Sequence, residues 1–159
     1  MKMGRGVEWA VHSCVNMAWT PPGEPVNSAR LAEFYKLPAA YLNKQFQSLV
    51  RAGVLDSVSG PRGGFLLARR PENITVLDIV LALEGAEPAF RCEAILGNVP
   101  EPVLQENFAR TCLISQTMRQ AELAWRQALA RQSIAGIADS MERRFPADKV
   151  KVLDYLAAG

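Results

Sequence analysis

Apolar residues at helical spacing predict the first element, a helix from Val7 to Trp19. One face of this helix carries the residues expected in the core, which are Val7, Val11, Cys14, Val15 and Ala18. The segment Thr20-Pro21-Pro22-Gly23 ends the helix, because two prolines and a glycine disfavour its continuation. Cys14 on the apolar face is therefore expected to behave as a small buried hydrophobe.

Two shorter helices joined by a tight turn are predicted next. The first follows Asn27, a good N-terminal cap, and ends at Leu37-Pro38. The second has Pro38 in its first turn, where no N–H group is needed, and runs to about Ala52, with Gly53 as its C-terminal cap. Such a pair is typical of the helix-turn-helix, whose second helix enters the major groove of DNA.

A β-hairpin and a fourth helix complete the first half of the chain. The short apolar segments Val54–Val58 and Phe65–Ala68 predict two strands, and the glycine-rich connection between them carries Arg62 at its tip. A hairpin in this position is the wing of a winged helix. The fourth helix begins at Thr75, with a capping box formed by Asp78, and ends at Gly85.

The second half of the chain is predicted to hold a long loop, a long helix and a short last helix, Ala147–Ala157. Residues 86–111 show weak periodicity, and a loop of this length is usually functional. After this loop, mostly apolar residues that recur at alternating spacings of four and three residues predict the coiled-coil seam of a long helix. The seam positions are Ile114, Met118, Ala121, Trp125, Ala128 and Gln132. We expect a homodimer through this helix, because a lone helix cannot bury both of its sides. Packing on its own domain is the alternative.

The elements predict a mostly α protein with a small β-hairpin wing (α+β), a winged helix-turn-helix plus a long dimerisation helix. We expect a DNA-binding domain over residues 1–85, a sensor loop over 86–111, and a dimerisation helix with a C-terminal helix over 112–159. The chain is 49% hydrophobic and 21% charged, as in soluble globular proteins. It has neither a long apolar run nor a signal peptide, so we expect a cytoplasmic protein without a membrane partner.

Charge and cysteine content narrow the function further. The net charge is only +2, yet residues 28–70 contain seven basic and two acidic residues, a local excess of five positive charges. This excess indicates a polyanion partner at one end of the molecule, with a solvated surface as the alternative. The three cysteines are an odd number without paired spacing. Thiols used as ligands or sensors are therefore favoured over disulfides.

Five segments together resemble the IscR/NsrR/RsrR-type winged-helix transcription regulators: Ala39–Lys44, Leu49–Leu55, Ser59–Arg69, Ile74–Val80 and Leu83–Gly85. The resemblance spans nearly the whole chain, and the Gly-Gly wing followed by the helix of Asp78 and Ile79 is its most specific part. It implies a homodimer that binds a palindromic operator in double-stranded DNA. It also implies, for many members, an iron–sulfur cluster in the loop before the dimer helix, held by three cysteines and a fourth ligand; other members have none.

Candidate DNA contacts follow from the predicted helices and from the resemblance: Asn27, Ser28, Ala40, Tyr41, Asn43, Lys44, Arg62 and Gly63. The amide of Asn43 suits an adenine edge, and Lys44 suits a phosphate or a guanine. Arg62 at the wing tip is placed to enter a narrow minor groove. Asn27 and Ser28 begin a helix, where backbone N–H groups hold phosphate. Tyr41 has two interpretations, a phosphate contact or a ring packed under its helix.

Cys92 and Cys112 occupy the positions of the first and last cluster ligands that the resemblance implies. The middle cysteine is absent, and its position falls near Phe108. Because an iron–sulfur cluster takes four protein ligands, oxygen or nitrogen donors must complete such a site. Glu8 and His12 stand one helical turn apart, about 5–6 Å at Cβ, on one face of the first helix.

The sequence therefore predicts a 2Fe–2S cluster held by Cys92 and Cys112 of one chain and by Glu8 and His12 of its partner. In some family members the first helix of one subunit supplies an acidic ligand, at the position of Glu8, to the cluster of the other. RsrR-type members resemble this pattern most, through Gly6–His12. A histidine ligand raises the reduction potential and makes reduction sensitive to protons, as suits a redox sensor. Trp9 is the candidate switch, and the change would pass through Trp9 and the dimer helix to the spacing of the two recognition helices.

Several alternatives stay open. Glu8 and His12 are each also explained as surface residues, and Glu93, Glu101 and Glu106 are substitute ligands in the loop. The same four donors would hold zinc tetrahedrally. A cluster-free regulator of the same fold would instead use a thiol switch or a small-molecule ligand. An enzyme is not expected, because the chain has a single histidine and no nucleotide fingerprint.

Overall fold

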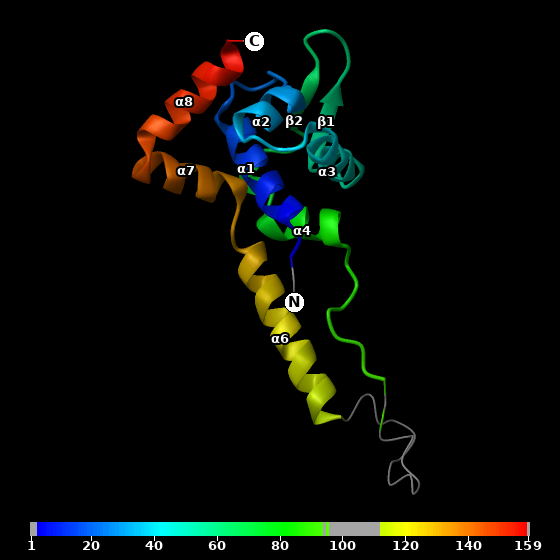
Figure 1. Cartoon of the computed structure of the whole chain (residues 1–159). Helices are drawn as coiled ribbons and strands as arrows, with labels where there is room; N and C mark the ends of the chain where they lie inside the picture. The colour runs from blue at the N-terminus through cyan, green and yellow to red at the C-terminus, as the bar shows by residue number, and fades with distance from the viewer. Residues whose placement is uncertain (1–2, 94, 96–111, 159) are drawn as a thin grey trace, which may run out of the picture.

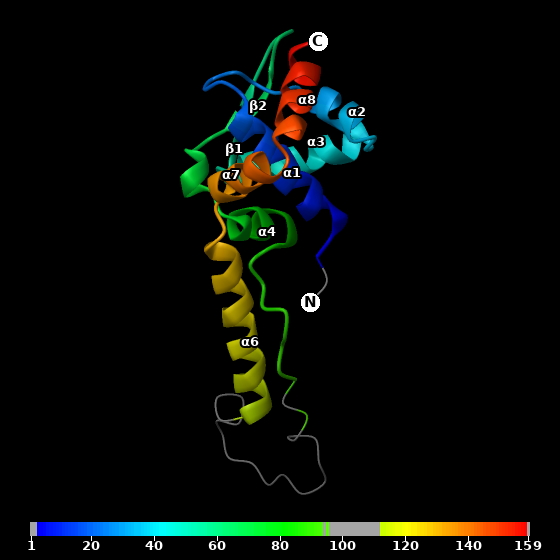
Figure 2. The same cartoon turned by 90° about the vertical axis from the view of Figure 1, so that its left-hand side faces the viewer.

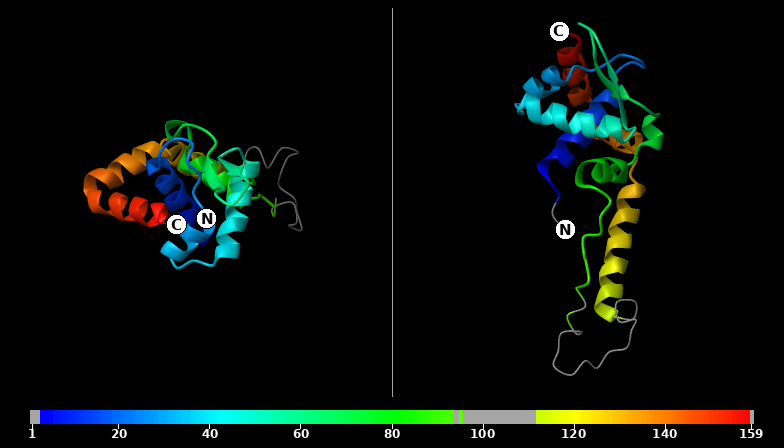
Figure 3. Two further views of the ribbon diagram at one scale, coloured as in Figure 1. Left: turned by 90° about the horizontal axis from the view of Figure 1, so that it is seen from above. Right: turned by 90° about the vertical axis from the view of Figure 1, so that its right-hand side faces the viewer.

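The computed structural model describes residues 3–93, 95 and 112–158. Helix α1 (Arg5–Trp19) runs through the middle of the folded body, between the C-terminal helices on one side and α3 on the other (Figures 1 and 3). The other elements are α2 (Ser28–Phe34), α3 (Ala39–Arg51), β1 (Leu55–Val58), β2 (Gly64–Leu67), the 3-10 turn η1 (Pro71–Asn73), α4 (Val76–Glu84), α6 (Leu113–Ala130), α7 (Ile134–Arg144) and α8 (Pro146–Ala157).

Local capping signals set the ends of the short helices, as the sequence predicts. The Asn27 side chain accepts hydrogen bonds from the backbone N–H groups of the first turn of α2. Thr75 and Asp78 form a reciprocal capping box at the start of α4, with the Thr75 N–H donating to Asp78 Oδ2 at 2.8 Å and the Asp78 N–H donating to Thr75 Oγ1 at 3.1 Å. Gly53 follows α3 with a φ of +66°, a conformation that glycine adopts without strain.

The wing is a two-stranded antiparallel hairpin anchored to the rest of the body. Leu55 of β1 stands opposite Leu67 of β2. Phe65 of β2 also exchanges two backbone hydrogen bonds with Val26, at 2.7 and 2.9 Å, in the connection between α1 and α2. The Phe65 ring packs against the ring of Phe46 from α3, with 5.0 Å between centroids. The mostly helical chain with its hairpin confirms the predicted winged helix.

Helix α6 stands away from this body, and the loop that follows Gly85 descends beside it (Figures 1 and 2). Within the chain α6 packs on α4. It nevertheless exposes large apolar side chains on two sides, namely Leu113, Ile114, Met118 and Leu123. Across the described ranges no helix, α6 included, has both the length and the apolar character that crossing a membrane requires.

The predicted seam is wrong at its last position, Gln132. Helix α6 ends at Ala130, and the chain then turns to pair with the segment before α4. The Val76 N–H donates to the Gln132 carbonyl at 2.9 Å, and the Ile134 N–H donates to the Ile74 carbonyl at 2.8 Å. These long-range backbone hydrogen bonds stop the helix and fasten the base of α6 to the body formed by the first four helices and the hairpin.

Helices α7 and α8 pack back on the body. The sequence analysis did not single out α7, whose buried Ile134 and Ala138 lie in the same core cluster as residues of α1. Helix α8 contacts α1 and α2, and its Tyr155 carbonyl accepts a hydrogen bond from the Arg30 guanidinium of α2. The same guanidinium lies 4.5 Å from the centre of the Tyr155 ring. The chain divisions predicted at residues 85/86 and 111/112 stay predictions.

Candidate DNA interface and sensor site

Helix α3 presents four candidate DNA-contact residues on its open side. Its buried residues are Leu42, Phe46 and Leu49, which turn one face of the helix into the core. The candidates Ala40, Tyr41, Asn43 and Lys44 are all exposed. This division follows from the 3.6-residue period of the helix, because the apolar positions fix which face turns inward and thereby free the polar face.

Of the two interpretations of Tyr41, the structure shows a packed ring, while a contact with phosphate stays a prediction. The Tyr41 side chain is 44% exposed at the start of α3. Its ring also meets the ring of Trp9 from α1 edge to face, with 5.4 Å between centroids and an interplanar angle of 79°. Tyr41 is thus both packed on α1 and open to solvent. The contact places Trp9 directly against α3, the predicted recognition helix.

The wing tip and the start of α2 hold the other DNA candidates. Arg62 is exposed at the tip of the hairpin. Gly63 has a structural reason for being glycine, since a Cβ atom there would lie 2.2 Å from the Val58 carbonyl oxygen. The Asn27 side chain already accepts from the Ala29 N–H at 2.8 Å, so this candidate serves as a helix cap, while contact of Asn27 or Ser28 with a phosphate stays a prediction.

Glu8 and His12 border one open cleft with a volume of about 210 Å³. Both side chains are exposed, one turn apart on α1. The other lining residues are Trp9, Tyr35 and Leu37. Two of these, Tyr35 and Leu37, belong to the turn between α2 and α3, and the sequence analysis missed them because hydrophobic periodicity says nothing about which turn packs beside which helix.

A buried polar contact supports the floor of this cleft. Asn16, fully buried on α1, donates a hydrogen bond from Nδ2 to the Tyr35 hydroxyl at 2.6 Å. The ring of His12 lies 6.0 Å from that of Tyr35. Burial raises the pKa of the Tyr35 phenol, although the hydrogen bond with Asn16 acts in the opposite direction. The phenol is therefore neutral at ordinary pH and holds the helix-turn-helix turn against α1.

The three cysteines have different environments. Cys14 is fully buried, and desolvation raises the pKa of its thiol to about 12, so it is protonated and inert at neutral pH. Cys92 and Cys112 are half-buried and free of disulfides. Cys112 directly precedes α6, at the end of that helix farthest from the body (Figure 1). Phe108, Glu101 and Glu106 lie outside the described residues.

The four candidate cluster ligands are not gathered within one chain. Nowhere in the described part of the chain do three or more His, Cys, Asp or Glu side chains come together as a metal site would require. The structure thus brings Glu8, Trp9 and His12 to one cleft, and leaves Cys92 and Cys112 on the α6 side.

Comparison with known proteins settles the family. A sequence profile described as "Rrf2: Iron-dependent Transcriptional regulator" matches residues 3–140. The chain belongs to the Rrf2 family. This Rrf2 protein is 30% identical over 145 residues to YffB of Lactococcus lactis, and the alignment covers 91% of this chain and 92% of YffB. The name of YffB assigns it provisionally to the HTH-type transcriptional regulators. It is 29% identical over 93 residues to the HTH-type transcriptional regulator IscR of Escherichia coli, covering 58% of this chain and 57% of IscR.

Solved structures share the fold of this Rrf2 protein. IscR of T. potens superposes with a TM-score of 0.68 at 24% identity, covering 91% of each chain. CymR of B. subtilis, described as the global cysteine regulator, superposes with a TM-score of 0.64 at 20% identity, covering 88% of this chain and 98% of CymR. The family match, together with this fold, makes the Rrf2 protein a winged-helix transcriptional regulator that binds DNA rather than an enzyme.

Proposed function

We propose that this Rrf2-family regulator binds a palindromic operator as a homodimer and senses redox state through a 2Fe–2S cluster. Cys92 and Cys112 of one chain would hold the cluster together with Glu8 and His12 of the partner subunit. The observation that carries this proposal is the cleft in which the exposed Glu8 and His12 lie beside Trp9, which in turn contacts the recognition helix.

The residues fit the proposed group chemically. Two free, half-buried thiols and a carboxylate–imidazole pair make up four donors of the kinds that iron takes. When bound, the cluster would supply a centre that accepts or releases one electron. The description of the family as iron-dependent supports this choice. The exposed apolar side chains of α6 support a dimer, which the site needs because one chain does not gather all four donors.

The chain offers a short path from the ligands to the DNA. Trp9 lies next to Glu8 in sequence, and its ring packs against Tyr41 at the start of α3. Tyr35 and Leu37 of the helix-turn-helix turn line the same cleft. A change in how Glu8 or His12 is held would therefore act on two points that position α3. This path is more direct than one through the dimer helix.

The ligand assignment is tested by the visible spectrum and by iron and acid-labile sulfide analysis of anaerobically purified protein. We expect the wild type to be coloured and to hold two iron and two sulfide per site. His12→Ala and Cys92→Ala should lose or strongly shift the absorption, because each removes one of four ligands. Cys14→Ala is the matched control and should keep the wild-type spectrum, since Cys14 is buried in the core. If both ligand variants keep the wild-type spectrum, the assignment is wrong.

Trp9→Ala should abolish the difference in operator affinity between oxidised and reduced protein. The substitution removes the ring that contacts Tyr41 while leaving Glu8 and His12 in place. Operator titrations at fixed salt, with the spectrum recorded to verify that the cluster is retained, measure this effect. An unchanged redox dependence would remove Trp9 from the signal path.

Arg62→Ala should weaken operator binding and reduce the slope of log affinity against log salt by about 2, because each of the two wings of the dimer loses one phosphate contact. Arg62 is exposed at the wing tip, where it can reach the DNA backbone or the minor groove. Arg143→Ala removes an equal charge from α7, on the side of α1 opposite α3 (Figure 3), and should leave the slope unchanged. Equal slopes for wild type and Arg62→Ala would exclude the wing contact.

A cluster-free regulator is the second candidate. The chain shares its fold with CymR, whose description names cysteine regulation, as well as with IscR. In this version the cleft at Glu8 and His12 would take a small molecule, or Cys92 and Cys112 would form a thiol switch. Zinc held by the same four donors is a third form. The spectrum and the iron and sulfide analysis separate the 2Fe–2S form from both of these forms, because a zinc or cluster-free protein is colourless and holds no sulfide.

A further inference from the structure

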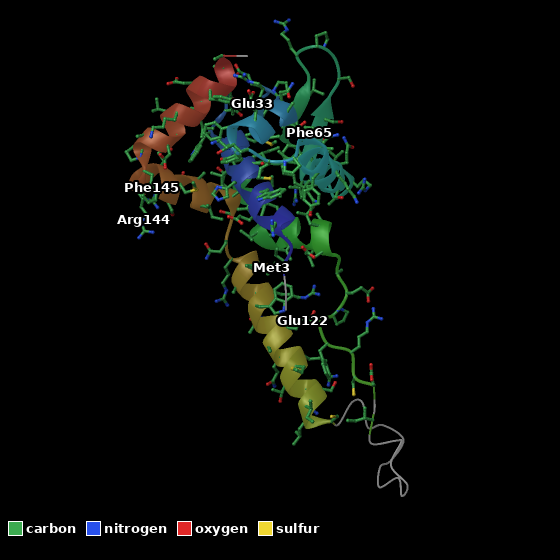
Figure 4. All side chains as sticks on the ribbon, viewed as in Figure 1. Met3, Glu33, Phe65, Glu122, Arg144 and Phe145 are labelled. Carbon is green, nitrogen blue, oxygen red and sulfur yellow. The ribbon has the colours of Figure 1, made fainter. Side chains whose placement is uncertain are left out.

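Two charged residues of α6 hold the loop that leads from α4 to Cys92. The Arg126 guanidinium donates from Nη2 to the Ala86 carbonyl at 2.8 Å. The Glu122 carboxylate accepts from the Ala89 N–H, through Oε2, at 3.1 Å. The loop lies beside α6 in three views, and Glu122 lies on the side of α6 that faces the loop (Figures 2, 3 and 4).

The same two residues also bind each other. Arg126 Nε donates to Glu122 Oε1 at 2.9 Å, and Arg126 Nη2 lies 2.7 Å from the same oxygen. Oε1 thus takes the guanidinium, and Oε2 remains for the loop amide. The side chains are only 24% and 14% exposed, for Arg126 and Glu122 respectively. The Arg91–Glu87 pair of the same loop is 73% and 77% exposed, as ordinary surface pairs are.

The contacts fix the register of the loop along α6. Ala89 is held at the level of Glu122, and the three residues from there to Cys92 span at most about 10 Å. Cys112 lies ten residues before Glu122, about 15 Å along a helix that rises 1.5 Å per residue. Fully extended, this segment can bring Cys92 to within about one helical turn of the level of Cys112. If the loop were shifted along α6 by a few residues, Cys92 and Cys112 could no longer lie at similar levels along that helix.

We propose that Glu122 and Arg126 are positioning residues of the sensor site: by clamping residues 86–89 to α6, they set the height at which Cys92 stands relative to Cys112. This inference rests on the proposed function in one respect, namely that Cys92 is a cluster ligand. The loop contacts of the clamp exist within a single chain and do not depend on a cluster.

The test is amide hydrogen exchange of the full chain, with and without the cluster, in two clamp variants. Glu122→Gln weakens the acceptor. The charge swap of Glu122→Arg with Arg126→Glu keeps an ion pair on the helix but has no acceptor for the Ala89 N–H and no donor for the Ala86 carbonyl. We expect peptides containing Ala89 to exchange about tenfold faster in the swap, as for a lost hydrogen bond to a charged group. Glu87→Gln, in the same loop, should exchange like the wild type.

A second measurement follows the loss of the cluster. In the swap variant the visible absorption should decay several-fold faster under air or a chelator than in the wild type and in Glu87→Gln. Wild-type exchange at Ala89 in the swap variant would overturn the clamp. Faster exchange combined with an unchanged decay would overturn the role of the clamp in positioning Cys92. If the wild type itself holds no iron or sulfide, the proposed cluster fails, while the exchange result still decides whether the clamp orders the loop.

Discussion

Replacing Ile114 and Met118 together with glutamate is expected to turn the proposed homodimer into monomers and to weaken operator binding by about 10²–10⁴-fold, the usual gain from joining two binding modules. Both side chains lie on the α6 seam and are exposed in the single chain, by 68% and 43%. A carboxylate buried there without a partner opposes association strongly. Analytical ultracentrifugation gives the oligomeric state, and operator titration at constant salt gives the affinity.

The matched control for this experiment is Gln127→Glu. It adds one negative charge to the same helix, where the double variant adds two, and it does so about 140° around the axis from the seam at 100° per residue. Gln127 is exposed, and the variant should stay dimeric with wild-type affinity. A double seam variant that sediments as a dimer would contradict the seam as the interface. Seam monomers would also fail to assemble a site that takes two ligands from each subunit.

Phe46→Ala is expected to lower the free energy of unfolding by about 3–5 kcal/mol, a large share of the roughly 5–15 kcal/mol typical of a domain. The Phe46 side chain is fully buried on the inner face of α3 and packs on Phe65 of the wing. Its loss leaves a cavity between the two elements that are expected to contact DNA. Urea unfolding followed by far-ultraviolet circular dichroism measures the effect.

Phe145→Ala removes the same side chain from an exposed position and serves as the control. The Phe145 side chain is 57% exposed, at the corner between α7 and α8 (Figure 4). Its replacement should change the free energy of unfolding by no more than about 0.5 kcal/mol. Both proteins should be compared in the same cofactor state, because bound cofactor adds to stability. Equal losses in the two variants would show that the core assignment of Phe46 is wrong.

The sequence predicts the parts of the candidate site that depend only on which face of a single helix a residue occupies. Glu8 and His12 stand on the exposed side of α1, and Cys14 stands in the core, as spacing alone predicts. The partners of these residues were not predictable. Tyr35 and Leu37 enter the cleft, and Tyr41 meets Trp9, only because the turn between α2 and α3 packs beside α1. Such contacts join residues that no shared periodicity relates.

The amino-acid sequence by itself determined the winged-helix elements, their caps and their inward faces. It could do so because capping hydrogen bonds and helical periodicity act between residues a few positions apart. The tertiary structure alone decided that α7 and α8 return to the body, that α6 stops before Gln132, and that Glu122 and Arg126 hold the loop of Cys92. These features depend on hydrogen bonds and packing between distant segments, which form only when the chain folds in three dimensions.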